Sequence, residues 1–222
     1  MEKKVRIKQI IQLTHDVKQI FVEKPDGYKF TPGHATEVSI DKDGWRDKKR
    51  PFTFTSLTNE DELEFVIKIY EDHNGVTEQI NHLKPGDNLI IRDTWGAISY
   101  NGKGYIIAGG AGITPYIAML RDLNEKNKLE GMHLIYSNKT DHDIILKNEL
   151  DQLLGDNVTY VITDQADTKH KKGFIDENFL KKSIDNFDQN FYVCGPPKMT
   201  EEVGDILNKL GASTNAVTLD DQ

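Results

Sequence analysis

The spacing of hydrophobic residues changes near residue 100 and divides the chain into two regions. Before this point, short segments rich in alternating apolar positions predict strands, and Val76, Ile80 and Leu83 recur at helical spacing. After it, apolar runs of strand length alternate with amphipathic segments of helix length. The first region predicts a six-stranded antiparallel β-barrel with one helix, and the second predicts an α/β doubly wound parallel sheet.

The turn at residues 101–104 separates the two regions. We therefore expect an N-terminal domain of residues 1–101 and a C-terminal domain of residues 102–222. Strands are expected at residues 5–13, 17–23, 35–40, 51–57, 63–70 and 88–92, and then at 105–108, 132–136, 158–163, 191–194 and 216–219. Helices of the second region are expected at residues 115–126, 143–154, 176–182 and 197–210.

Composition limits the function classes. With 222 residues, 37% hydrophobic and 29% charged, the chain is typical of a globular protein, and no apolar run approaches membrane length. We expect a cytoplasmic protein with no membrane span. The single Cys194 excludes an internal disulfide and a cysteine-ligated iron–sulfur cluster or structural zinc site within this chain. Any redox chemistry therefore requires a bound organic cofactor.

The charge distribution argues against a general nucleic-acid-binding role. Lys and Arg number 28 against 36 Asp and Glu, a formal charge of −8. Two local basic clusters occur, at residues 46–50 and 169–172, and we interpret the second as solvated loop charge. No histidine pair has zinc-binding spacing, and residues 140–143 are better explained as a helix N-cap, so we expect no metal.

Residues 106–115 run an apolar strand into a glycine turn and a helix start. Gly110 and Gly112 carry no side chain that would block close approach to the backbone, and a helix beginning beside Pro115 presents unpaired N–H groups to an anion. This pattern predicts a nucleotide phosphate site. Because it is Gly-x-Gly-x-x-Pro, and does not end in Gly or Ala, it could alone be an ordinary strand-to-helix turn.

Residues 193–199 form a second turn of this kind. The expected strand stops at Cys194 and Gly195, and two prolines begin a helix, which leaves room for a flat ring against the backbone. The alternative is a helix start that requires two prolines. Ligands of doubly wound sheets bind outside the carboxyl ends of the strands, where both turns are expected.

The first region contains an arginine, an aromatic residue and a hydroxyl within four positions. Arg50 offers a planar fork suited to phosphate, Phe52 an aromatic face and Thr53 a hydroxyl group. Taken singly, this combination is also common in ordinary strands.

Together these segments resemble the ferredoxin–NADP(+) reductase superfamily of flavoproteins, in the same order and over nearly the whole chain. The resemblance implies an FAD-binding barrel, an NAD(P)H-binding α/β domain and two catalytic residues, Thr53 at the flavin N5 edge and Cys194 beside the nicotinamide. The implied flavin-binding residues are Arg50, Pro51, Phe52, Thr53, Ile67, Lys68, Tyr70, Gly75, Val76 and Thr77. The implied nicotinamide-nucleotide residues are Gly110, Gly112, Thr114, Pro115, Cys194, Gly195, Pro196, Pro197 and Met199.

The implied activity is hydride transfer from NAD(P)H to bound FAD, with electrons passed on to flavodoxin, ferredoxin or another acceptor. FAD is favoured over FMN because residues 75–77 resemble a diphosphate site. Two alternatives remain, a reductase of free flavin or other small acceptors and a non-autonomous flavin electron-transfer subunit. An acidic acceptor needs a basic face, which the chain could supply only around Arg46, Lys48 and Lys49.

Three features depart from the family pattern. Phe52 replaces the usual tyrosine. No aromatic residue follows Tyr192, so the C-terminal ring that stacks on the flavin in plant-type members is absent, although Trp95 or Trp45 could replace it. Where NADP-dependent members tend to place an arginine, this chain has Thr163 and Asp164, and a carboxylate would repel a 2′-phosphate. NADH is therefore favoured, although Lys139 at another strand end could bind a phosphate.

Overall fold

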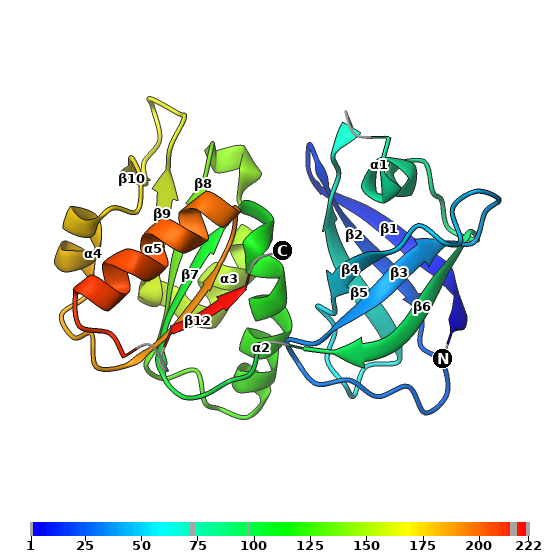
Figure 1. The fold of residues 1–222 in the computed structure, drawn as a ribbon, viewed down its shortest axis with the longest axis horizontal. Coiled ribbons are helices and arrows are strands. Elements are labelled where there is room, and N and C mark those ends of the chain that lie inside the picture. Colours follow the sequence, from blue (N-terminus) through cyan, green and yellow to red (C-terminus); the bar gives the residue numbers. More distant parts are fainter. Residues whose placement is uncertain (1, 72–73, 97, 214–216, 221–222) are drawn as a thin grey trace. The chain divides into compact units, whose positions relative to one another are not determined.

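The computed structural model describes residues 2–71, 74–96, 98–213 and 217–220 (Figure 1). Its contacts define two compact units. The first contains Met1–Ser99 and Thr114–Asp122, and the second contains Tyr100–Ile113 and Leu123–Gln222. Most of the helix after the glycine turn thus groups with the N-terminal strands, while the domain boundary expected at residues 101/102 stays a prediction.

The first unit contains the predicted antiparallel sheet, whose strand order is β4-β3-β6-β1-β2-β5. An isolated bridge between Phe54 and Phe65 joins the end of β4 to β5, the two outermost strands, as a barrel requires. The strands are β1 Lys3–Thr14, β2 Val17–Glu23, β3 Ala35–Ile40, β4 Arg50–Thr53, β5 Glu62–Lys68 and β6 Asn88–Trp95.

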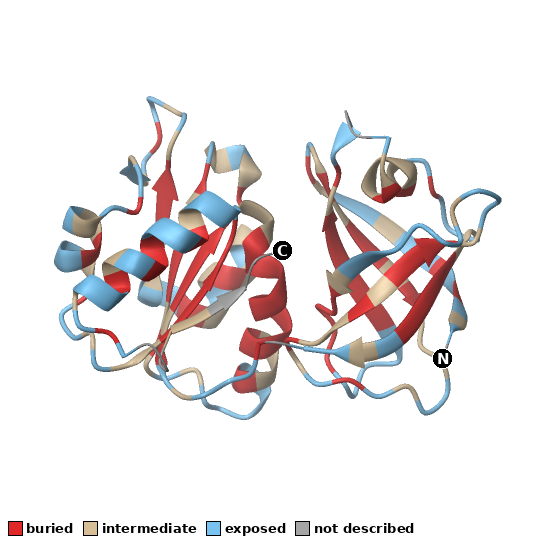
Figure 2. Ribbon diagram, viewed as in Figure 1, coloured by how far each residue is buried: buried red, intermediate tan, exposed pale blue. Residues whose placement is uncertain are grey.

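Alternation along these strands directs one face into the barrel. Val5 and Ile7 are buried on β1, whereas Lys4 and Arg6, each of which directly precedes one of them, are exposed. The expected helix is α1, Val76–Asn81, whose Val76 and Ile80 belong to the same core cluster as the strand residues. Buried segments therefore follow the strands of the barrel (Figure 2).

The second unit is built on a parallel sheet of order β10-β9-β8-β7-β11-β12. The chain leaves β7 to one side, towards β8, and returns to place β11 on the other, so strand order reverses between β7 and β11. This reversal is the position where doubly wound sheets bind ligands. The strands are β7 Gly104–Gly109, β8 Met132–Asn138, β9 Val158–Ile162, β10 Lys171–Lys172, β11 Asn190–Cys194 and β12 Val217–Asp220.

Four α-helices accompany the parallel strands along the chain. Leu180 of α4 and Val203 and Leu207 of α5 pack in one cluster with Ile107 and Val193 of the sheet. The helices are α2 Thr114–Glu125, α3 Lys147–Leu154, α4 Glu177–Ser183 and α5 Pro197–Lys209. No helix in the described part of the chain combines the length and apolar character needed to cross a membrane.

Three details differ from the expected elements. The helix expected at residues 143–154 begins only at Lys147, because the Asp143 carboxylate accepts hydrogen bonds from the backbone and hydroxyl of Thr140, both 2.8 Å long, and caps a short 3₁₀ turn instead. Residues 140–143 therefore do form a capped turn, as expected, but the cap belongs to this 3₁₀ turn and the N-cap of α3 itself is Leu146. The short edge strand β10 carries two exposed lysines and was not predicted, and Ala216 of the last expected strand lies outside the described residues.

Candidate functional site

The two turns predicted to bind the nucleotide are in direct contact at the strand reversal. Ala108 on β7 pairs with Cys194 on β11, so both strands end side by side. A Cβ atom on Gly112 would overlap the carbonyl of Cys194 and the amide nitrogen of Gly195. A Cβ atom on Gly109 would lie 2.5 Å from the Met199 sulfur. Both turns therefore depend on glycine to come this close.

The structural need for glycine at position 112 is thus different from the one expected, which was close approach of a ligand to the backbone. The missing side chain makes room for the neighbouring Cys194–Gly195 peptide. Gly110 is the residue with unusual backbone geometry, because its φ of 53° lies in the left-handed region. Its carbonyl accepts a 2.8 Å hydrogen bond from the Tyr136 hydroxyl. Residues Gly110–Ile113 form a 3₁₀ turn, after which Thr114 and Pro115 begin α2.

The second turn exposes its prolines and buries its thiol. Cys194 is fully buried at the end of β11, whereas Pro196 and Pro197 are exposed. Gly195 is buried, and Met199 is half-buried in the first turn of α5. The surface that this turn offers to a flat ring is therefore formed by backbone and prolines, and the catalytic role of Cys194 stays a prediction.

The predicted flavin motif occupies β4, an edge strand of the first unit. Pro51 is compatible with this position because an edge strand can lack one backbone donor. Arg50 is exposed, and among the described residues it hydrogen-bonds only the carbonyl of Lys49, at 2.8 Å. Phe52 is half-buried against the barrel core, and Thr53 is 4% exposed. Arg50 is consequently available to an anionic group such as a flavin phosphate.

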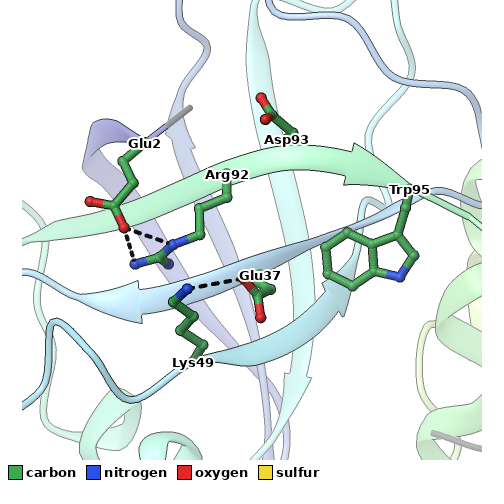
Figure 3. A pocket seen from close by; sticks show the side chains of 6 residues that line it. All are labelled: Glu2, Glu37, Lys49, Arg92, Asp93 and Trp95. Atoms are coloured by element: carbon green, nitrogen blue, oxygen red, sulfur yellow. Dashed lines mark hydrogen bonds and ion pairs between the residues drawn. The ribbon is translucent and has the colours of Figure 1, made fainter.

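Trp95 shares a sheet face with Thr53. Both residues pair with Ala35 of β3, one from each side, so the small alanine lies between them. Trp95 is 45% exposed and lines an open pocket of about 530 Å³ (Figure 3). Trp45, the other candidate for a stacking aromatic, packs against the core with the Lys48 amine 4.0 Å from its ring centre. Of the two tryptophans, Trp95 is therefore the better candidate for the aromatic residue that stacks on the flavin.

His34 was missed from the sequence and lies beside the same motif. Its Nδ1 atom is buried and has no hydrogen-bond partner within the described part of the chain. Its carbonyl accepts the amide of Phe54 at 3.0 Å, directly after Thr53. A buried nitrogen without a partner is a feature that a bound polar group can satisfy. No spacing in the sequence singled out His34, because its proximity to Thr53 follows from strand pairing.

The second predicted flavin segment is partly buried in the barrel core. Ile67 and Val76 are buried in the barrel core. Tyr70 is 47% exposed, and Thr77 is half-buried. Gly75 is the N-cap of α1 and has no side chain to bond the amides of the first turn. No side chain at this cap therefore competes with a diphosphate for these amides.

Lys68 is already engaged in an ion pair. Its amine lies 2.7 Å from Oδ2 of Asp16. Burial alone would raise the pKa of Asp16, but hydrogen bonds and charge from Lys68, with a hydrogen bond from Thr14, hold the pKa below its usual range. Lys68 is therefore a poorer phosphate ligand than its sequence position suggests.

We expect Asp16→Asn to destabilise the barrel by about 0.5–1 kcal/mol at pH 7, because it removes this ion pair. The pKa of Asp16 is depressed in the folded state, so its contribution is full above the unfolded value of about 4 and is lost as pH falls through the folded value. Urea unfolding at pH 7 and at pH 3 measures this. The exposed Asp61→Asn variant is the control, and an Asp16 effect of equal size at both pH values would contradict the assignment.

Two of the four basic residues in the cluster at residues 46–50 are paired with carboxylates. Arg46 is bound to Asp41 at 2.7 Å and to Asp43 at 2.5 Å. Lys49 lies 3.3 Å from Glu37, as Figure 3 shows. Arg46 and Lys49 therefore add less positive charge to this surface than the sequence suggests.

The residues expected to select the nicotinamide cofactor lie at neighbouring strand ends. The amide of Asp164, after β9, donates to the carbonyl of Lys139, after β8, at 2.8 Å. Both residues are exposed. The Asp164 carboxylate and the Lys139 amine thus belong to hydrogen-bonded neighbours. The choice between NADH and NADPH is therefore expected to depend on both residues.

The two halves of the chain match two known families. Residues 2–89 match the model of the FAD-binding domain. Residues 106–205 match the model of the oxidoreductase NAD-binding domain. The cofactors are therefore FAD and NAD(P)H.

Curated relatives cover most of the chain. NADH-cytochrome b5 reductase 2 of Mycosarcoma maydis is 30% identical over 89% of this chain and 62% of its own length. The protein of the same name from Scheffersomyces stipitis is 32% identical over 86% of this chain and 70% of its own length. The toluate 1,2-dioxygenase electron transfer component of Pseudomonas putida is 25% identical over 82% of this chain and 55% of its own length. The chain thus spans less than two thirds of some relatives.

The fold agrees with a solved structure. The ferredoxin NADP+ reductase from Neisseria gonorrhoeae, with bound FAD and NADP, superposes with a TM-score of 0.87 at 16% identity, over 99% of this chain and 98% of that one. The antiparallel barrel, the doubly wound sheet, the two family models and the curated relatives agree. The chain belongs to the ferredoxin–NADP(+) reductase superfamily of NAD(P)H-dependent flavoprotein oxidoreductases.

Proposed function

We propose that this protein carries electrons from NADH through FAD to a one-electron haem acceptor of the cytochrome b5 type. The observation that carries the proposal is that one chain holds both an exposed Arg50 in its predicted flavin motif and a glycine turn at the sheet reversal of its second unit, and that its relatives are named NADH-cytochrome b5 reductases. Bound FAD accepts two electrons from a nicotinamide and can release them singly, which the chemistry of a haem acceptor requires.

The residues of the chain supply binding and orientation. Arg50 is proposed to hold a flavin phosphate, and the first-turn amides of α1 the rest of the diphosphate. Thr53 would orient the reactive edge of the flavin through its hydroxyl, and Trp95, which shares a sheet face with Thr53, would offer an aromatic face to the ring. The turn at residues 194–197 would position the nicotinamide ring.

The pairing of Arg46 and Lys49 with carboxylates, together with the names of the relatives, guides the choice of acceptor. An acidic flavodoxin or ferredoxin would need an unpaired positive face, whereas Arg46 and Lys49 are bound to carboxylates. The names of the relatives point to cytochrome b5, or to oxygenase components in the case of the P. putida protein. We therefore place cytochrome b5 first and flavodoxin or ferredoxin last.

A parallel assay tests the acceptor. FAD-loaded protein is supplied with NADH and, separately, with cytochrome b5, ferredoxin, flavodoxin, free FMN or a dye. We expect cytochrome b5 to be reduced with the highest kcat/KM. Fast reduction of the dye with no preference for cytochrome b5 would favour the reductase of small acceptors. If FAD stays oxidised in every mixture, the protein does not turn over by itself, and only the non-autonomous electron-transfer subunit is consistent with the result.

Asp164 is proposed to favour NADH over NADPH. Its carboxylate is exposed at the carboxyl end of β9, and exposed like charges about 4 Å apart repel by about 1 kcal/mol. Asp164→Ser should therefore raise kcat/KM for NADPH about fivefold and leave NADH within about twofold. Asp156→Ser, immediately before the opposite end of the same strand, is the control. If the ratio of kcat/KM for NADH to kcat/KM for NADPH does not change, Asp164 does not select the cofactor, and Lys139 or another residue does.

A further inference from the structure

A buried ion pair joins α2 to the barrel within the first compact unit. Glu64 on β5 is 5% exposed, and Nη1 of Arg121 on α2 lies 3.0 Å and 3.1 Å from its two carboxylate oxygens. The same nitrogen donates to the carbonyl of Thr55 at 2.7 Å. The Thr55 hydroxyl donates to Glu64 at 2.7 Å, and the Glu64 amide donates to the Ser56 hydroxyl at 3.0 Å.

The residues of this network belong to strands and a helix that also carry segments assigned to the cofactors. Thr55 follows Thr53 by two residues, and its amide donates to the Glu64 carbonyl at 2.9 Å, beside the Phe54–Phe65 bridge. The strand that carries Glu64 leads into the second flavin segment at residues 67–70. Arg121 stands on the helix that begins at Thr114 in the glycine turn. One guanidinium thus connects the flavin strands to the helix of the nucleotide turn.

Stability alone is a weak reason for such a pair. Removing two charges from water costs about as much as their attraction returns, and buried pairs can often be replaced by apolar residues without loss. A charged hydrogen-bond network differs from an apolar contact in being directional, so it fixes the angle and register at which a helix packs. The Arg121 side chain is 15% exposed and that of Glu64 6%, so water competes little for these bonds.

We propose that Arg121 and Glu64 are positioning residues that hold α2 against the flavin strand β5 and so set the position of its first residues, Thr114 and Pro115. The inference rests on the proposed function, because it gives this packing a role in cofactor alignment. Neither residue needs to touch a cofactor. Their effect is exerted through Thr55 and Ser56 on one side and through Thr114 and Pro115 on the other.

The test compares the apolar double variant Arg121→Met/Glu64→Met with Lys8→Met/Glu23→Met. The second pair joins exposed side chains at 3.1 Å on the same barrel. In the FAD-loaded proteins we measure thermal unfolding, FAD affinity, amide hydrogen exchange of residues 114–122 and the rate of FAD reduction at saturating NADH. If the double variant is poorly folded, Arg121→Lys, which keeps the charge and loses the fork, replaces it.

We expect the buried-pair variant to retain its melting temperature and FAD affinity, to exchange the amides of residues 114–122 about tenfold faster, and to reduce FAD about tenfold more slowly. The exposed-pair variant should match the wild type in all four measurements. Unchanged exchange at residues 114–122, or a loss of rate that merely follows a loss of folded protein, would overturn the proposal. If wild-type FAD is not reduced at all, the proposed function fails, and the exchange measurement still decides whether the pair positions α2.

Discussion

Thr53→Val is expected to slow the reduction of FAD by NADH by about 10- to 100-fold, while the Kd for FAD changes by less than about threefold. Thr53 is 4% exposed and lies opposite Ala35, and valine keeps its β-branching and approximate shape while replacing the hydroxyl with a methyl group. Loss of a hydrogen bond in a buried site costs about 1–3 kcal/mol, and each 1.4 kcal/mol on a barrier is about a factor of ten.

Stopped-flow reduction at saturating NADH measures this rate separately from binding. Thr53→Ser keeps the hydroxyl and should retain most of the wild-type rate. Equal rates for the valine variant and the wild type would remove Thr53 from the proposed role. A parallel loss of FAD would instead make Thr53 a binding residue.

Gly112→Ala is expected to destabilise the second unit by about 2–4 kcal/mol, which lies in the range of overpacking in a tightly packed region. The new Cβ would overlap the Cys194 carbonyl and the Gly195 amide, both of which are backbone groups and cannot rotate away as side chains can. The two turns would have to separate, so NAD(P)H binding should weaken as well.

Gly110→Ala is the matched control in the same turn. A Cβ atom on Gly110 would meet no neighbouring atom within 4 Å, so its only penalty is a φ of 53°. That penalty is about 1–2 kcal/mol for a residue in the left-handed region. Chemical unfolding and NAD+ binding of both variants measure the difference. A Gly112 variant no less stable than the Gly110 variant would contradict the close packing of the two turns.

The fold follows largely from local patterns in the sequence. Alternation along residues 5–13 and 63–70 indicated a barrel, and strand–helix alternation after residue 100 indicated a parallel sheet. The glycine turns at Gly110 and Gly195 were found because chain direction and steric demand are local properties. The late start of α3 was not predicted, since the Asp143 carboxylate caps a separate turn.

The remaining features depend on residues distant in sequence. Glu64 and Arg121 are 57 positions apart, and charged residues within strands and helices are normally expected to face solvent. The neutralisation of Arg46 and Lys49 was equally hidden, because a cluster of one charge in the sequence does not reveal its partners across strands. The spacing of residues along the sequence therefore identified the candidate cofactor segments. It did not identify the ion pairs between distant residues that fix their surroundings.

The most direct test of the central claim is an anaerobic titration of the purified, FAD-loaded protein with NADH, followed by visible absorbance. The account predicts that the flavin band bleaches within the stopped-flow time range and returns when cytochrome b5 is added. A protein that takes up no FAD, or one whose bound FAD stays oxidised with both NADH and NADPH, would contradict it.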